Sequence, residues 1–260
     1  MFLTSHSSVA LDFFGPSPNA NILHIKHDGE RALSAYIEKH FDKLGVISEL
    51  GVKPSDLLQA NGVIWVEGPS DCIYLNRWIG LYSNGELQEG RDYQCAFYGG
   101  ALLARTQFCP PEDAEKELIN LLRLSHNIIV VCDGDRKSSS ARIKDRVRRI
   151  ASEVSKIPNA VSWITEAREI ENYLRAPVLQ KALGLASQPP DPGQYEPFFP
   201  RKSDPTNSYW TSHLPGVATI DKVDLAAMTT QHMTRADLDS RFGLETQIQK
   251  ICDASRGWSK

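Results

Sequence analysis

The chain has 260 residues, of which 41% are apolar, and this allows one large or two modest domains with a buried core. Its 29 Lys and Arg residues against 32 Asp and Glu residues give a net charge of −3, so nucleic-acid binding would need local positive patches. No apolar run approaches the roughly 18 residues of a membrane span, and the first residues lack the basic segment of a signal peptide. We therefore expect a cytoplasmic protein with no membrane partner. Its five cysteines form no C-x-x-C pair and are predicted to be free thiols, mostly buried.

Residues 1–58 are too few to form an independent domain. Within them, residues 2–6 (FLTSH) and 21–28 (NILHIKHD) are expected as short strands, and the region around residues 31–50 as a helix. We therefore separate this segment from the domain that follows.

Residues 59–186 alternate short apolar runs with stretches of helical periodicity. The runs predict strands at 62–68, 93–100, 127–135 and 160–165, and the periodic stretches predict helices near 69–82, 112–124 and 139–156. Apolar runs without alternation are typical of strands buried on both faces. The predicted fold class is therefore α/β, with a central parallel sheet flanked by helices, and ligand sites in such sheets lie at the carboxyl ends of the strands.

Two further segments complete the chain. Residues 187–216 hold seven of the 15 prolines and show no period, which predicts a long surface insertion. Residues 217–260 are predicted to be a helical extension of the domain, with helices over 221–233 and 236–254. Asp237 is the expected N-cap of the last helix.

Six carboxylates follow three of the predicted strands: Glu67, Asp71, Asp133, Asp135, Glu169 and Glu171. Asp71 can point to the same side as Glu67 if it lies in the first turn of the next helix, and Gly134 frees the backbone between two aspartates. Carboxylates this close would repel one another unless a cation lay among them. Oxygen ligands at one sheet edge are what Mg²⁺ or Mn²⁺ requires. The alternative is that each acidic residue only caps the following helix.

Two motifs give a family resemblance. GVIWVEGPSDCIYLNRWI (62–79) followed by IIVVCDGD (128–135) resembles a Toprim domain, a Rossmann-like fold for metal-dependent phosphoryl transfer. With YGG (Tyr98, Gly99, Gly100) and REIENYL (168–174), the chain is similar to the C-terminal half of OLD-family (overcoming lysogenization defect) nucleases. Within that half, residues 59–186 would be the Toprim catalytic domain, and residues 217–260 its C-terminal helical extension.

The N-terminus agrees with this resemblance. FLTSHSSVALDFF (2–14) is similar to the last strand and switch-histidine loop of an ABC-type ATPase, with His6 as the histidine, so residues 1–58 would be the end of such a domain and a linker. No G-x-x-x-x-G-K-[ST] motif occurs, so we expect no ATP binding by this chain alone. The resemblance implies an ATPase half in the same full-length protein or in a separate chain.

The resemblance also implies a reaction, namely DNA endonuclease activity with two Mg²⁺ or Mn²⁺ ions about 4 Å apart. Glu67 would be a metal ligand that can also act as general acid or base, and Asp71 its companion. Asp133 and Asp135 would bind metal, and Glu171, or else Glu169, would be the further ligand. DNA is the implied partner, with a helicase partner, a homodimer and a role in anti-phage defence or DNA processing as further implications.

The family's additional lysine corresponds to Lys222, which would neutralise charge that develops on the phosphate in the transition state. The alternative is that Lys222 is a surface lysine paired with Asp221 or Asp224.

A basic segment is the expected DNA contact. Residues 136–149 carry seven basic side chains and one acid, and the proposed phosphate contacts are Arg136, Lys137, Arg142, Arg146 and Arg149. Three of these arginines, at 142, 146 and 149, would share one face of a helix that starts directly after Asp135. The alternative is an ordinary solvated face. Aromatic residues of the insertion (Tyr195, Phe198, Phe199, Tyr209 and Trp210) would either stack on DNA bases or, as we favour, pack the insertion onto the body.

Two other functions use similar motifs or surfaces. A haloacid-dehalogenase-type phosphatase is disfavoured because Lys137 occupies the place that a Thr or Val takes in the D-x-D-x-[TV] motif. The second rival is a non-catalytic DNA-binding or regulatory module that needs the missing ATPase half.

Overall fold

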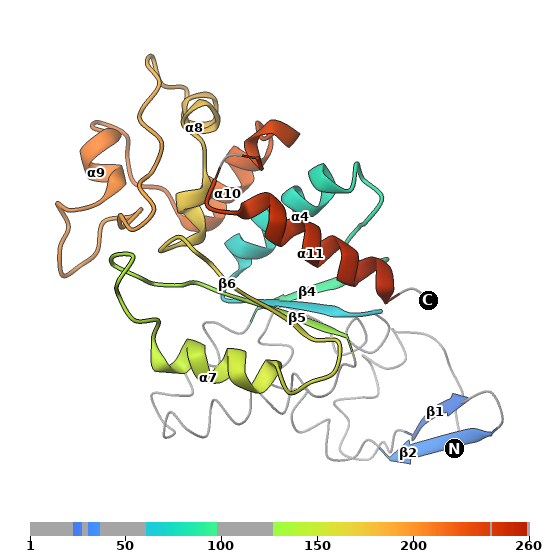
Figure 1. The fold of residues 1–260 in the computed structure, drawn as a ribbon. Coiled ribbons are helices and arrows are strands. Elements are labelled where there is room, and N and C mark those ends of the chain that lie inside the picture. The colour runs from blue at the N-terminus through green and yellow to red at the C-terminus, as the bar shows by residue number, and fades with distance from the viewer. Residues whose placement is uncertain (1–22, 28–30, 37–60, 98–126, 240, 259–260) are drawn as a thin grey trace, which may run out of the picture.

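The computed structural model describes residues 23–27, 31–36, 61–97, 127–239 and 241–258 (Figure 1). Its centre is a four-stranded sheet in the order β4-β3-β5-β6, made of β3 (Val63–Val66), β4 (Gln94–Phe97), β5 (Ile128–Cys132) and β6 (Val161–Ile164). All three strand pairings are parallel, with Ile64 aligned with Cys95 on one side and Ile129 on the other. The α/β class and the parallel sheet are confirmed.

The two central strands are buried along their whole length, because helices cover both faces of the sheet. Figure 1 shows α4 (Pro69–Tyr82), α8 (Ala176–Leu183), α10 (Lys222–Thr230) and α11 (Leu244–Gly257) on one side of the sheet and α7 (Asp145–Val154) on the other. Helix α10 packs against α4 and α8, and α11 packs against α4 and β6. On the α7 side, Val147, Ile150 and Val154 close the core.

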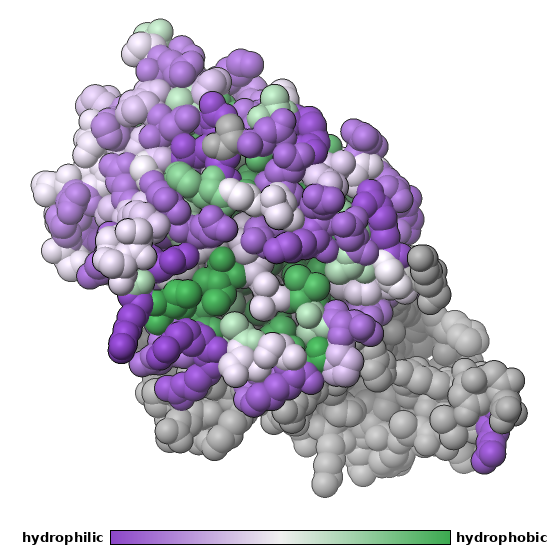
Figure 2. All heavy atoms as spheres, viewed as in Figure 1, coloured by the Kyte–Doolittle hydropathy of each residue, from purple (hydrophilic) through white to green (hydrophobic). Residues whose placement is uncertain are grey.

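The surface beside α7 is less polar than its surroundings. Figure 2 shows hydrophobic residues in a band between α7 and the helices of the opposite face, while hydrophilic residues cover most of the rest of this view. Strand β6 lies at the edge of the sheet and is only partly covered. The partly buried residues of this layer are Ile143, Ile157, Ala160 and Ile164.

The helix predicted near 139–156 begins later than expected. Helix α7 starts at Asp145, with Lys144 as N-cap, and a turn closed by Ala141 N–H donating to the Ser138 carbonyl precedes it. Consecutive serines favour turns over helix interiors, which accounts for the later start of the helix. Arg142 therefore lies outside the helix, and the expected three-arginine face does not form. The side chain of Arg146 lies outside the described residues.

The N-terminal segment contains a hairpin. Strands β1 (Leu23–His27) and β2 (Ala32–Tyr36) pair antiparallel, with His27 opposite Ala32. The first strand was predicted, whereas the helix expected around 31–50 is wrong over Ala32–Tyr36. The sequence between them contains Asp-Gly, a common hairpin signal that outweighs the weak helical pattern. Outside the described residues lie FLTSH with His6, the YGG motif (98–100) and the helix expected at 112–124.

The Pro-rich insertion is packed onto the body. It contains the short helix α9 (Tyr209–His213), and Phe198, Tyr209 and Trp210 are fully buried. The rings of Phe198 and Tyr209 stack with centroids 5.2 Å apart, and those of Phe199 and Trp210 with centroids 5.3 Å apart. Packing, the favoured interpretation of these aromatics, is therefore confirmed for the buried three.

The C-terminal extension is helical as predicted, but its last helix starts at Leu244. Asp237 is not the N-cap of that helix. Its carboxylate accepts hydrogen bonds from the backbone N–H (2.7 Å) and hydroxyl (2.8 Å) of Thr234, at the 3₁₀ turn η2 (Arg235–Asp237). Positive φ angles at Phe242 (40°) and Gly243 (72°) separate that turn from α11.

Four cysteines lie in the described part of the chain, and all are free thiols: Cys72, Cys95, Cys132 and Cys252. All but Cys72 are buried, as predicted. Among the described helices, none is long and apolar enough to cross a membrane.

Candidate active site

The predicted acidic groups meet at one edge of the sheet. Glu67 follows β3 directly, Asp133 follows β5 directly, and Glu169 and Glu171 come shortly after β6. Because β3, β5 and β6 are parallel neighbours, their carboxyl ends lie at the same edge. This juxtaposition is the one that the sequence predicts.

Asp71 lies in the first turn of α4 and faces back toward Glu67. Its Oδ2 accepts hydrogen bonds from the backbone N–H groups of Glu67 (3.1 Å) and Gly68 (3.0 Å), and its Oδ1 accepts one from the Ser70 hydroxyl (3.3 Å). Asp71 thus satisfies donors at the helix start, although this capping role does not use all the lone pairs of its two oxygens. The same bonds fix its carboxylate, which is 8% exposed, beside the strand end.

The loop after β5 makes a tight approach to the loop after β6. A Cβ on Gly134 would lie 2.4 Å from the carbonyl oxygen of Thr165, and the Gly134 N–H donates to Thr165 Oγ1 at 2.8 Å. Glycine is therefore needed at position 134, because any side chain there would clash with the Thr165 backbone. We expected Gly134 to adopt an unusual backbone conformation, but the positive φ of this loop (52°) belongs to Asp135.

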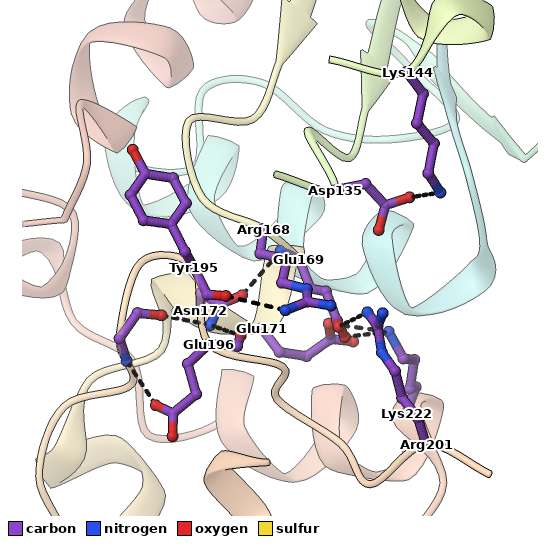
Figure 3. A network of polar contacts seen from close by, with 11 residues as sticks. Asp135, Lys144, Arg168, Glu169, Glu171, Asn172, Tyr195, Glu196, Arg201 and Lys222 are labelled. Atoms are coloured by element: carbon purple, nitrogen blue, oxygen red, sulfur yellow. Dashed lines mark hydrogen bonds and ion pairs between the residues drawn. The ribbon is translucent and has the colours of Figure 1, made fainter. Parts of the chain in front are cut away.

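The two aspartates of this loop have different neighbours. Asp133 interacts with Asp71, Glu67, Glu171 and Lys222. Asp135 forms an ion pair with Lys144, as Figure 3 shows, and its backbone N–H donates to the Arg168 carbonyl at 3.0 Å.

The REIENYL motif forms a 3₁₀ turn, η1 (Ile170–Tyr173), that is held by the insertion. Asn172 is fully buried and accepts a hydrogen bond from the Glu169 N–H at 2.9 Å. Its amide donates to the carbonyl oxygens of Gly193 (2.7 Å) and Glu196 (3.0 Å). These bonds set the positions of Glu169 and Glu171.

Lys222, the first residue of α10, reaches this turn from the C-terminal extension. Its Nζ lies 3.1 Å from Glu171 Oε2 and 3.4 Å from Glu169 Oε2 (Figure 3). The lysine thus pairs with the glutamates rather than with Asp221 or Asp224. Lys222 and the two glutamates are about 50 positions apart in the sequence, so their contact depends on the tertiary fold.

Arg201, which the sequence analysis gave no catalytic-site role, also joins the site. Its Nη2 lies 2.7 Å from Glu169 Oε1, so this carboxylate is held between Arg201 and Lys222. The ring of Phe199 lies 5.6 Å from Lys222 Nζ. Both Arg201 and Phe199 come from the Pro-rich insertion, whose lack of a period hid this contribution.

The electrostatics show how crowded the acidic groups are. Burial, reinforced by the charge of Glu171, raises the pKa of Asp71 to about 7. Burial, then the charges of Asp71 and Glu67, raises the pKa of Asp133 well above its usual value. Burial also raises the pKa of Glu171, although Lys222 opposes the shift.

The same neighbours stabilise the charged form of Lys222. Burial works against its charge, but Glu171, Glu169 and Asp133 outweigh it and raise the lysine pKa. Lys222 is therefore protonated throughout the neutral pH range.

A divalent cation fits this donor set. Glu171 is fully buried, and its Oε1 has no hydrogen-bond partner in the described part of the chain. Such an orphaned carboxylate oxygen, next to the repelling charges of Glu67, Asp71 and Asp133, suits a hard cation. No three Asp, Glu, His or Cys side chains of the described ranges are already gathered as a metal-binding group. Side-chain nitrogens instead contact three of the carboxylates: Glu169, Glu171 and Asp135.

The basic segment adjoins this edge through the contact between Lys144 and Asp135. Lys137, Arg142 and Arg149 are exposed, whereas Arg136 is partly buried and its Nε has no partner within the described residues. The segment is therefore a loop followed by a helix, with most of its charges facing solvent.

Comparisons with protein-family models, characterised proteins and solved structures found no match to this chain.

Proposed function

We propose that this chain is a metal-dependent DNA endonuclease of the Toprim type, the C-terminal catalytic region of an OLD-type, ATP-regulated nuclease in anti-phage defence or DNA processing. The observation that supports this most strongly is the meeting of four mutually repelling carboxylates (Glu67, Asp71, Asp133 and Glu171) with protonated Lys222 at the carboxyl edge of a parallel sheet. Phosphodiester hydrolysis needs this combination of metal ligands and a fixed positive charge.

The four carboxylates would hold Mg²⁺ or Mn²⁺, and Asp135 or Glu169 would join them after leaving Lys144 or Arg201. When bound, two such ions would supply a water nucleophile and stabilise the leaving oxygen. Glu67, at the end of β3, is the residue we assign to proton transfer. Lys222 is held by Glu171 and Glu169, and its one remaining N–H donor would face the charge that develops on the phosphate.

The exposed basic segment at 136–149 would bind the neighbouring phosphates of the DNA strand. The regulatory ATPase half, a helicase partner and homodimerisation belong to the same proposal.

Plasmid nicking tests the proposal. The purified chain should convert supercoiled plasmid to nicked circles with Mg²⁺ or Mn²⁺ and do nothing in excess chelator. Glu171→Gln should lose this activity because it removes a buried ligand charge. Glu166→Gln, an exposed change just before the same turn, should nick at the parental rate.

The opposite result would favour the second candidate function. A folded, metal-loaded protein that binds DNA but never nicks it would be a DNA-binding or regulatory module.

A further inference from the structure

Two arginines beside the acidic edge have hydrogen-bond donors that no other described residue accepts. Arg168 is 7% exposed, and its only side-chain hydrogen bond in the described residues runs from Nη1 to the Tyr195 carbonyl at 3.2 Å. Its Nε is buried and has no acceptor within the part of the chain that the structure describes. Arg201, with a side chain 41% exposed, uses Nη2 for Glu169, and its other donors have no acceptor among the described residues.

The local charge is not balanced. Figure 3 shows the guanidinium groups of Arg168 and Arg201 near Glu169, with Lys222 on the same carboxylate. Burial, then the charge of Arg201, lowers the pKa of Arg168, so the two cations repel each other. Glu169 already shares its oxygens between Arg201 and Lys222. Lys222 also pairs with Glu171, so three cations face two paired carboxylates, and the excess is the single charge of Arg168, which forms no ion pair within the described residues.

We propose that Arg168 and Arg201 form an anion subsite that binds a phosphodiester group of the DNA strand next to the one that is cleaved. A guanidinium matches phosphate oxygens with paired donors, and a phosphate here would be bound by the exposed donors of Arg201 and by Nη2 of Arg168, which has no hydrogen-bond partner among the described residues. The backbone bond from Asp135 N–H to the Arg168 carbonyl places this subsite beside the candidate metal ligands. The inference rests on the proposed function, and it assigns the Pro-rich insertion to substrate binding.

Metal-free binding tests the subsite separately from cleavage. The anisotropy of a labelled single-stranded DNA oligonucleotide is measured in chelator at several salt concentrations, with inorganic phosphate as competitor. Arg201→Ala should weaken binding on the order of tenfold and reduce the slope of log Kd against log salt by about 0.7. Phosphate should compete less well against this variant than against the parent.

Two further variants sharpen the result. Lys202→Ala removes the same charge from the next residue of the insertion, which is exposed and has no described side-chain partner, and should change Kd less than twofold. Arg168→Lys keeps the charge but loses the planar fork, and should weaken binding toward the level of Arg201→Ala.

Failure of the subsite and failure of the nuclease proposal are distinguishable. If Arg201→Ala binds as tightly as Lys202→Ala, or if the parent does not bind the oligonucleotide, the subsite is wrong, whatever the plasmid shows. If binding depends on both arginines but no variant or parent nicks DNA, the subsite stands and only the nuclease proposal fails.

Discussion

The crowded carboxylates predict that the metal-free protein becomes less stable as pH rises. The pKa of Asp71 is raised from 3.8 to about 7, and at 1.36 kcal/mol per unit this shift is worth about 4 kcal/mol of unfolding free energy. Because the folded state holds this proton after the unfolded chain has released it, the contribution is complete below pH 4. It is lost as pH rises to about 7.

Urea unfolding in chelator, followed by the fluorescence of the five tryptophans, measures this loss. The parent should lose about 2–3 kcal/mol between about pH 5 and pH 8, the upper figure being that of a fully independent group, because part of the total loss already occurs between pH 4 and pH 5. Asp71→Asn keeps the oxygen that accepts the Glu67 and Gly68 N–H bonds and should lose clearly less. Mg²⁺ should restore stability at pH 8 in the parent more than in the variant.

The matched control is Asp224→Asn, an exposed change on α10 that should leave the parental pH dependence intact. Parallel curves for the parent and Asp71→Asn in chelator would refute the reasoning, because they would mean that burial and the neighbouring charges do not hold this carboxylate in its protonated form.

Three further predictions concern catalysis, packing and nucleotide use. Lys222→Ala should slow single-turnover nicking by ~10²–10³ with unchanged metal affinity, whereas Lys181→Ala should not, and equal small losses would reduce Lys222 to a general positive charge. Gly134→Ala should lower the unfolding free energy by roughly 2–3 kcal/mol in the same urea titration, because the added Cβ would clash with the Thr165 carbonyl. Its control is Gly80→Ala on α4, where a Cβ meets nothing within 4 Å, and this change should raise the unfolding free energy by about 0.5–1 kcal/mol. The chain alone should release no phosphate from ATP in a colorimetric assay, and turnover above a buffer blank would contradict that.

Local signals sufficed where a few adjacent residues determine the structure. Helix α4 spans the predicted residues because Pro69 at its first position and Asp71 two residues later mark its start. The acidic edge was predictable because uninterrupted apolar runs identify parallel strands, and parallel strands place their carboxyl ends together.

Long-range contacts account for what the sequence did not show. Arg201 lies 32 positions from Glu169 in an aperiodic segment, and only the buried aromatics of the insertion place it at the site. The different surroundings of Asp133 and Asp135 depend on the close approach of Gly134 to Thr165, which no pattern in the sequence signals.

The most direct test of the central claim is to measure nicking and metal-free stability together for Asp133→Asn. This change removes one charge from the cluster, so plasmid nicking with Mg²⁺ or Mn²⁺ should disappear, while unfolding free energy in chelator at neutral pH should equal or exceed that of the parent. A variant that nicks at the parental rate, or that unfolds much more easily than the parent without metal, would contradict a shared metal site at this edge of the sheet.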